Sequence, residues 1–366
     1  MHCSTNNHVS LLLNGDNTFS AIFSAIQQAQ KVILIQFYIV RDDKIGQELS
    51  CLLQKKAAEG VKIYFLYDAI GSHKLPENYI QYLRNADIQI FSFPAGRSIL
   101  NKFQLNFRNH RKVVVIDGHT GFIGGHNVGD EYLGRKPPLA PWRDTHIKIT
   151  GPVVTCLQES FAQDWFWSTK ELPDMLPLTK CPKQEMLCQL ITTGPADTEE
   201  AATLLLLDAA SQAEHRLWIS TPYFVIDDTV FSALKLAALR GIDVRILLPQ
   251  KSDSWVVHAA SMLYAFEALH SKIRVFRYQP GFIHQKIILI DEAIAVIGSA
   301  NLDNRSIHLN FEIMLLTVDI QFAAEVSDML EKDFKQANEL SITDQKHIRR
   351  WQNLGMRIAR LVSPIL

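Results

Sequence analysis

Two short stretches of the sequence carry side chains that could act together on a phosphate ester. In one, His110 and Lys112 lead into an apolar run, and in the other His284 and Lys286 do the same. A neutral imidazole can attack phosphorus, while a neighbouring ammonium group stabilises the negative charge that gathers on the phosphate oxygens. The two pairs are therefore predicted to be the half-sites of one phosphodiester-cleaving centre.

The two stretches agree at further positions. Counted from each histidine, a lysine follows at offset 2, an aspartate at offset 7, a glycine at offset 14 and an asparagine at offset 17. A histidine, a lysine and an aspartate at fixed offsets should occur by composition on the order of once in ten thousand positions. Two copies with a matching glycine and asparagine therefore indicate duplicated chemistry rather than coincidence.

Strand geometry predicts which of these side chains reach the phosphate. Alternate side chains share one face of a strand, so the histidine and lysine of each copy project together. Asn127 and Asn301 can donate amide hydrogens to the phosphate oxygens. Asp117 and Asp291 lie at odd offsets, so they either hold a strand end or turn or, if a bulge reverses the strand, join the catalytic set. We include both aspartates among the candidates and keep the two interpretations open.

No metal or other cofactor is expected at this centre. Neither motif has a His-x-x-x-His pair with a glutamate or a carboxylate-rich set of ligands, and the lysine charge would repel a cation. His126, His146, His258 and His308 are expected to be structural histidines. The five cysteines lack a Cys-x-x-Cys pair, so they predict neither a zinc cluster nor a disulfide framework.

The elements that must position these residues are also repeated. Apolar strand-like runs at 32–38 and 61–66 flank a helical pattern, and runs at 217–224 and 241–248 flank a second one. Continuous apolar strands that alternate with helices favour sheets covered by helices. We predict an α/β fold of two tandem repeats, each a mixed β-sheet flanked by helices, packed as a pseudo-twofold pair.

The length and the proline content predict where the repeats divide. A chain of 366 residues suggests two domains or one duplicated domain. Three prolines between Leu172 and Pro182 interrupt any helical or alternating pattern. We therefore predict a first repeat at 1–172, a linker at 173–187 and a second repeat at 188–366.

The overall charge and hydropathy exclude some classes of protein. The chain has 37 Lys+Arg and 38 Asp+Glu, so it lacks the general cationic field of a nucleic-acid-binding protein, and no nucleic-acid partner is expected. Its apolar runs are far shorter than the roughly 18 residues that span a bilayer, and its first residues lack the pattern of a secretory signal. These features predict a protein on the cytoplasmic side without a transmembrane segment.

The paired motifs resemble the phospholipase D superfamily, and residues 9–366 resemble the bacterial cardiolipin synthases. The segments that carry this closer resemblance are 109–112, 124–134, 142–146, 221–225, 298–306 and 310–312. Three positions depart from the family pattern: Ile226 replaces a usual proline, His126 a usual apolar residue and Gln36 a common glutamate.

This resemblance implies a phosphatidyl transfer in two steps. One histidine would attack the phosphorus of phosphatidylglycerol and form a phosphatidyl-histidine while glycerol leaves, and a second phosphatidylglycerol would then accept the phosphatidyl group to give cardiolipin. The resemblance implies His110 as the nucleophile, His284 as the acid and base, and Asp144 and Glu312 as the carboxylates that orient them. The same covalent route would serve a phospholipase D that uses water, which the motifs do not exclude, whereas a nucleic-acid phosphodiesterase or a non-catalytic lipid-binding module fits less well.

Two segments could bring such an enzyme to a membrane surface. Aromatic and aliphatic residues alternate with arginine and lysine over 91–108, immediately before His110. Residues 346–365 form a basic amphipathic helical pattern. Either segment could lie in the headgroup region of a membrane or pack against the protein core. We expect a peripheral enzyme at the cytoplasmic face of the membrane, with phosphatidylglycerol as its lipid partner.

Overall fold

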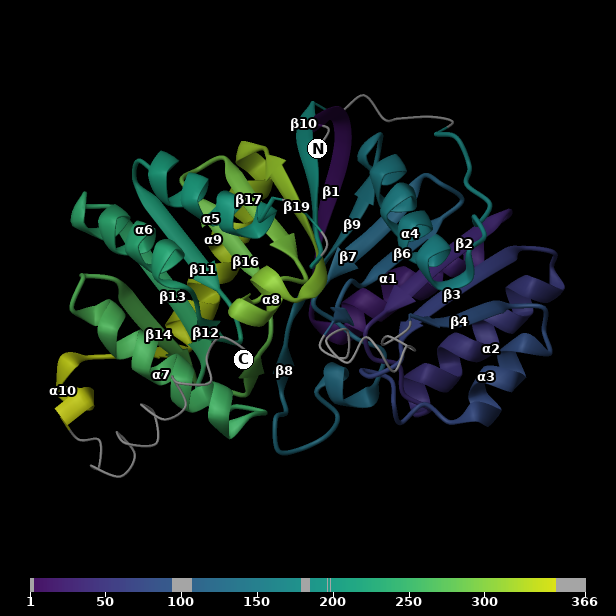
Figure 1. The fold of residues 1–366 in the computed structure, drawn as a ribbon, viewed down its shortest axis with the longest axis horizontal. Coiled ribbons are helices and arrows are strands. Elements are labelled where there is room, and N and C mark those ends of the chain that lie inside the picture. Colours follow the sequence, from purple (N-terminus) through teal and green to yellow (C-terminus); the bar gives the residue numbers. More distant parts are fainter. Residues whose placement is uncertain (1–2, 94–106, 179–184, 196, 198, 347–366) are drawn as a thin grey trace.

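One mixed β-sheet runs through the whole molecule in the computed structural model (Figure 1), which describes residues 3–93, 107–178, 185–195, 197 and 199–346. The strand order in this described part is β20-β14-β13-β11-β16-β17-β19-β10-β1-β9-β7-β6-β2-β3-β4. Seven strands on each side of the β10–β1 junction follow the same order of pairing.

The first half of the chain contributes the strands and helices in the right half of Figure 1. Its elements are β1 (Cys3–Leu13), α1 (Asn14–Gln28), β2 (Val32–Phe37), α2 (Lys44–Ala58), β3 (Lys62–Asp68), α3 (Glu77–Arg84), β4 (Gln89–Phe93), β5 (Arg108–Asn109), β6 (Val113–Ile116), β7 (Thr120–Gly124), the 3-10 helix η2 (Asp130–Leu133), β8 (Trp142–Arg143), β9 (Thr145–Thr150) and α4 (Val153–Thr169).

The second half repeats this succession and adds short elements at its end. Its elements are β10 (Met186–Thr193), α5 (Ala201–Gln212), β11 (Arg216–Ser220), β12 (Phe224–Val225), α6 (Asp228–Leu239), β13 (Asp243–Pro249), α7 (Trp255–Leu269), β14 (Arg274–Tyr278), β15 (Phe282–Ile283), β16 (Ile287–Ile290), β17 (Ile294–Gly298), β18 (Leu302–Asp303), α8 (Asn304–His308), β19 (Asn310–Val318), α9 (Ile320–Lys335), β20 (Ala337–Glu339) and α10 (Ile342–Lys346).

The pairing of the strands confirms the predicted α/β class with two repeats of one mixed sheet. In each half, three strands of the main strand order are parallel (β2-β3-β4 and β11-β13-β14), and the other strands of that order pair antiparallel. The antiparallel pairing of β1 with β10 joins the two halves edge to edge. A twofold repeat of this kind puts equivalent strand ends close together at the junction.

Alternating burial explains why both faces of this sheet are covered. Ile33 and Ile35 pack with α1, α2 and α3, whereas Leu34 between them packs into a cluster that contains residues of α4 and α9. In the second half Leu217 and Ile219 pack with α5, α6 and α7. The cluster around α4 and α9 includes residues of both repeats, so the hydrophobic core is continuous across the junction.

Two short parallel pairings, here called crossings, join strands of the first repeat to strands of the second. β5 of the first repeat pairs with the start of β19, and β8 of the first repeat pairs with β15. These two crossings stand directly before the histidine of each motif. They are the elements that assemble the site.

Several sequence predictions can be compared with these elements. The predicted helices coincide with α2 and α6, but residues 110–112 lie between β5 and β6 rather than inside one unbroken strand. The division at 172 and 188 stays a prediction, although α4 ends at Thr169 and β10 begins at Met186. Of the proposed membrane segments at 91–108 and 346–365, residues 94–106 and 347–365 lie outside the described residues. Among the described helices, none combines the length and the apolar content needed to cross a bilayer.

Candidate active site

The two crossings place each histidine beside a carboxylate of the other repeat. Asn109 is opposite Phe311 in the β5–β19 register, so His110 comes next to Glu312, and His110 Nδ1 lies 2.9 Å from Glu312 Oε2. Ile283 is opposite Arg143 in the β15–β8 register, so His284 comes next to Asp144, where the Nδ1–Oδ2 distance is 2.7 Å. Each half-site therefore needs both repeats.

Both histidines line one cavity of about 380 Å³ between the repeats, a volume within the usual range of roughly 300–1,000 Å³ for small-molecule sites. The described residues around it are Tyr38, Ile39, Arg108, His110, Asn127, Tyr132, Trp142, Tyr223, Asp253, Val257, His284, Asn301, Asp303, Arg305 and Asn310. The structure thus brings together the two predicted histidines and the two predicted asparagines.

Burial keeps both imidazoles neutral in this cavity. It lowers the pKa of His110 to about 4, against the opposing effect of the Glu312 charge. Burial and the charge of Lys286 lower the pKa of His284 to about 3, although Asp144 acts in the opposite direction. Because each Nδ1 carries the proton that its carboxylate accepts, each Nε2 keeps a lone pair for chemistry.

The two lysines of the motifs are buried beside the histidines. Lys112 Nζ donates to the carbonyl of His110 at 2.5 Å, and Lys286 Nζ donates to the carbonyl of His284. Burial lowers the pKa of Lys112 to about 7 and that of Lys286 to about 8. Within the described residues neither ammonium group makes a direct ion pair, although carboxylates lie nearby, and two buried ammonium groups favour the binding of an anion between them.

The carboxylates behind the histidines remain ionised although both are fully buried. Burial acts to raise the pKa of each, but the histidines and lysines more than offset it, and both pKa values lie below their ordinary values. Glu312 also accepts a hydrogen bond from Ser299 Oγ at 2.5 Å. Asp144 lies so close to Gly125 that a Cβ atom there would meet its Oδ1 at 2.1 Å. A glycine is therefore required at position 125.

A buried arginine ties the first half-site together. Arg111 donates from Nη1 to both oxygens of Asp164 on α4 at 3.0 and 2.9 Å. Its Nε donates to the backbone carbonyl of Glu312 at 3.1 Å, and its Nη2 donates to the carbonyl of Thr193 at 3.1 Å. The guanidinium thereby fixes the strand that carries Glu312 relative to the segment that carries His110.

The second half-site also contains a buried pair of an arginine and an aspartate. Arg143, which precedes the carboxylate rather than following the histidine, binds Asp333 on α9 through Nε and Nη2, both at 3.0 Å. Gln285 follows His284 and donates to Asp333 at 3.0 Å. Asp164 and Asp333 escaped the sequence interpretation because a lone aspartate in a helix is usually solvated.

The two asparagines are oriented differently. The Oδ1 of Asn127 accepts from the backbone N–H of Ile39 at 3.1 Å, which leaves its amide hydrogens for a ligand. The side chain of Asn301 hydrogen-bonds Asp303, and within the described residues its Oδ1 has no partner. A donor role toward phosphate therefore fits Asn127 better than Asn301.

Asp117 and Asp291 lie at the opposite ends of β6 and β16 from the histidines. Asp117 accepts from the backbone N–H groups of Gln30, Lys31 and Val32 at 2.8 to 2.9 Å. Asp291 does the same for residues 214–216. These aspartates anchor the start of the neighbouring strand, which favours the interpretation that they hold a strand end or turn.

The four histidines that were expected to be structural are not among the described residues that line the cavity. His126 and His146 are buried behind it, where His146 Nδ1 accepts from the backbone N–H of His126 at 3.3 Å. His258 lies on α7, and His308 Nδ1 lies 3.3 Å from a Glu200 oxygen. The sequence interpretation missed most of the polar rim of the cavity: Tyr38, Arg108, Tyr223, Asp253, Asp303, Arg305 and Asn310.

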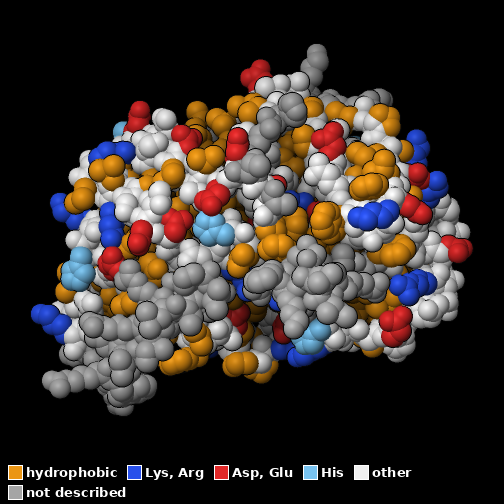
Figure 2. Space-filling view, in the orientation of Figure 1, with side chains coloured by type: hydrophobic (Ala, Val, Ile, Leu, Met, Phe, Trp, Pro, Cys, Tyr) orange, Lys and Arg blue, Asp and Glu red, His pale blue; other side chains and the backbone are white. Residues whose placement is uncertain are grey.

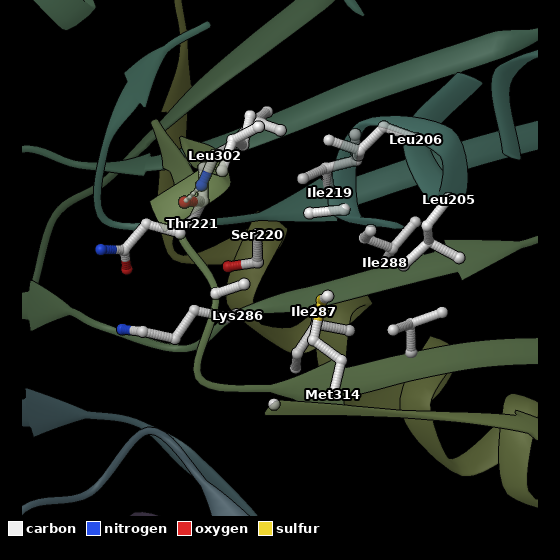
Figure 3. Close-up of a pocket in the computed structure, with 16 residues that line it drawn as sticks. Leu205, Leu206, Ile219, Ser220, Thr221, Lys286, Ile287, Ile288, Leu302 and Met314 are labelled. Carbon is white, nitrogen blue, oxygen red and sulfur yellow. Dashed lines mark hydrogen bonds between the residues drawn. The ribbon is translucent and has the colours of Figure 1, made fainter. Parts of the chain in front are cut away.

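A smaller apolar cavity lies behind Lys286. Figure 3 shows Lys286 extending away from the aliphatic side chains of Leu205, Leu206 and Ile288. This cavity measures about 30 Å³, room for about two water molecules. It is a packing space beneath the site and too small for a lipid chain.

Comparisons with known proteins find close relatives of this sequence. The sequence profile of the family described as cardiolipin synthase, PLD-like domain, matches residues 22–165 and 206–336. The chain is 59% identical over 366 residues to cardiolipin synthase A of Pseudomonas fluorescens Pf-5 and 58% identical to cardiolipin synthase A of Pseudomonas syringae pv. syringae B728a. Each match covers all of this chain and 76% of the relative.

Solved structures support the fold alone, because their sequence identities are low. The phosphatidylserine synthase of Haemophilus influenzae superposes with a TM-score of 0.72 at 17% identity, over 98% of this chain and 95% of that one. The polyphosphate kinase of Porphyromonas gingivalis superposes with a TM-score of 0.63 at 13% identity, over 98% of this chain and 53% of that one.

Proposed function

Because the chain belongs to the cardiolipin synthase family of phospholipase D-like proteins, we propose that it converts two phosphatidylglycerol molecules into cardiolipin and glycerol. The observation that carries this proposal is the pair of His–carboxylate contacts, 2.9 and 2.7 Å long, that face one cavity from two repeats. Such an arrangement can hold a phosphodiester between a nucleophile and a proton donor.

In the first step His110 acts as the nucleophile. Its Nε2 lone pair attacks the phosphorus of the donor lipid, the P–N bond forms, and the bond from phosphorus to the headgroup oxygen breaks. His284 gives a proton to that oxygen, so glycerol leaves as a neutral alcohol. Glu312 supports the positive charge that develops on the His110 ring, since its Oε2 lies 2.9 Å from Nδ1.

In the second step His284 acts as the base. It takes the proton from a headgroup hydroxyl of the second phosphatidylglycerol, the oxygen attacks phosphorus, and the P–N bond to His110 breaks. Both imidazoles then return to their starting states. Lys112, Lys286 and the amide of Asn127 stabilise the oxygens of each five-coordinate transition state.

The proton on His284 depends on the substrate. The pKa of His284 is about 3, which leaves the ring neutral at pH 7. A bound phosphodiester adds negative charge beside the ring and offsets the charge of Lys286, so it raises this pKa. Binding of an anionic lipid thus supplies the acid that cleavage needs.

The lipid substrate places the enzyme at a membrane, and we propose a peripheral position at the cytoplasmic face. Acidic and basic side chains are interspersed on the face of the molecule shown in Figure 2, and the chain carries a net charge of -1. Such a surface lacks the broad cationic field that a nucleic-acid phosphodiesterase needs. We therefore propose phosphatidylglycerol as the lipid partner and no nucleic-acid partner.

Product analysis tests the proposal. Purified protein is incubated with acyl-labelled phosphatidylglycerol in mixed micelles, and lipids and free glycerol are quantified. We expect one glycerol for each cardiolipin formed, and no reaction by the His110→Ala/His284→Ala double variant. Formation of phosphatidic acid without cardiolipin would assign the protein to the phospholipases instead.

A further inference from the structure

Two arginines from different repeats stand at the rim of the catalytic cavity. Arg108 is the first residue of β5 and lies opposite Asn310 in the register with β19, and Arg305 lies on α8. Both are half-buried. Neither belongs to the His-Lys motifs, and the mechanism above gives neither a task.

These guanidinium groups lie within electrostatic reach of each other. Burial lowers the pKa of Arg305, and the charge of Arg108 lowers it further. Both arginines also act on the Tyr38 phenol, whose ring packs edge-on against His110 with centroids 4.8 Å apart. Two like charges held at one rim beside a nucleophile favour an anion between them.

The chemistry of the product brings a second anion to the cavity. Cardiolipin contains two phosphodiesters joined by one glycerol, so the acceptor hydroxyl arrives with its own phosphate a few bonds away. The first phosphate occupies the space between the histidines, where Lys112 and Lys286 balance its charge. A hydrolase that uses water has no use for a second such site.

We propose that Arg108 and Arg305 bind the phosphodiester of the acceptor lipid and so select a phosphate-bearing alcohol over water. This inference rests on the proposed function and deepens it. Arginine suits the role because its planar fork of donors matches two phosphate oxygens. The acceptor glycerol then lies between the two phosphates, with its free hydroxyl directed toward His284.

The carboxylates in the same cavity can accept hydrogen bonds from the acceptor glycerol. Asp253 accepts a hydrogen bond from Tyr223 at 2.5 Å, and Asp303 accepts from the backbone N–H of Ser306 at 2.6 Å. Hydroxyl groups can donate to such carboxylates while they accept from the nearby guanidinium groups.

Two soluble acceptors that differ in the phosphodiester test the inference. Phosphatidylglycerol serves as the donor, and deuterated glycerol or glycerophosphoglycerol serves as the acceptor, with products measured by mass spectrometry. We expect the wild-type kcat/KM to be about tenfold or more higher for glycerophosphoglycerol. Arg108→Gln and Arg305→Gln should reduce this preference to about threefold or less, and Arg305→Lys should restore part of it.

The control and the contrary outcomes are separate from those of the proposed function. Arg274→Gln removes an arginine that binds Glu339 on the outer strands β14 and β20, so it should keep the full preference. Equal use of both acceptors by the wild type, or an unchanged preference in both rim variants, would overturn the second anion site. Failure of the wild type to form cardiolipin from phosphatidylglycerol alone would instead reject the proposed function. The wild-type comparison stands even if a variant does not fold.

Discussion

In the half-site of His110 the orienting carboxylate is a glutamate that Ser299 holds through a hydrogen bond, whereas in the half-site of His284 it is an aspartate that lies against the α-carbon of Gly125. Ser299 and Gly125 occupy equivalent places, each directly after the glycine that ends β17 or β7. The shorter aspartate needs the space that a glycine leaves, and the longer glutamate reaches a hydroxyl. The two His–carboxylate distances nevertheless agree within 0.2 Å.

The two buried arginines likewise give similar support to the two half-sites from different positions in the sequence. Arg111 follows His110 in the sequence and donates to the backbone carbonyl of Glu312. Arg143 precedes Asp144 and binds Asp333, which also accepts a hydrogen bond from the residue after His284. Each closes the junction between repeats at one half-site. The duplication preserves the positions of the two histidine rings at one phosphate site, whereas the residues that support the rings differ between the repeats.

The largest expected difference between the half-sites is in the covalent step. His110→Ala should abolish the phosphatidyl-enzyme adduct and lower turnover by about ten-thousand-fold, because no nucleophile remains. His284→Ala should lower phosphatidylglycerol turnover by a similar factor, because glycerol then leaves without a proton. Acid-quench mass spectrometry of the intact protein measures the adduct.

A donor with a p-nitrophenol leaving group separates the two roles. This phenolate needs no proton to leave, so His284→Ala should still release one p-nitrophenol per enzyme in a burst, whereas His110→Ala should give none. An adduct that forms in His110→Ala but not in His284→Ala would exchange the two assignments.

Gly125→Ala should damage the second half-site selectively. The new Cβ would lie 2.1 Å from Asp144 Oδ1, so the carboxylate and the ring of His284 must shift. A misplacement of about 1 Å in a catalytic group costs about a hundredfold in rate. Turnover of phosphatidylglycerol should fall by this factor, while the p-nitrophenol burst should fall far less. An equal loss for both donors would place the damage in the first half-site.

The residues in these predictions differ in how far the sequence could reveal them. The His-Lys pairs and Asn127 were predicted because spacing within one segment repeats. Asp144 and Glu312 entered only through a family resemblance, since each serves a histidine in the other repeat. The shared position of Arg108 and Arg305 could not be predicted, because the pairing of β5 with β19 brings them together. No local sequence pattern indicates which strands of different repeats will pair.

The two aspartates of the motif show what strand alternation can and cannot establish. Their odd offset indicated a position away from the phosphate, and Asp117 and Asp291 do lie in turns with positive φ of 51° and 49°. Alternation assumed an unbroken strand from the histidine onward, yet 110–112 are not in a strand. The fold class was easier to predict because buried apolar runs and helical spacing persist over many residues.

The pH dependence should report the lysines of both half-sites. Lys112, with a pKa of about 7, and Lys286, with a pKa of about 8, are charged below those values and lose their charge as the pH rises through them. Because kcat/KM reflects the free enzyme, loss of the Lys112 charge alone should lower it by about a hundredfold between pH 6.5 and 9, and the proton that His284 must carry adds to this fall. It should not decline from pH 6.5 down to pH 5, since His110 is protonated only near pH 4. A kcat/KM that rises between pH 7 and 9 would contradict this assignment.

Ser299→Ala should give the smallest change and should affect the opposite half-site from Gly125→Ala. It removes the hydrogen bond to Glu312 Oε2, but Asn310 still donates to Oε1 at 3.1 Å and His110 still binds the same carboxylate. Turnover should therefore fall only about threefold to tenfold. Because Glu312 supports the nucleophile, the loss should be the same for phosphatidylglycerol and for the p-nitrophenol donor. A loss confined to phosphatidylglycerol would mean that Ser299 supports protonation of the leaving group. That result would contradict the roles assigned to the two half-sites.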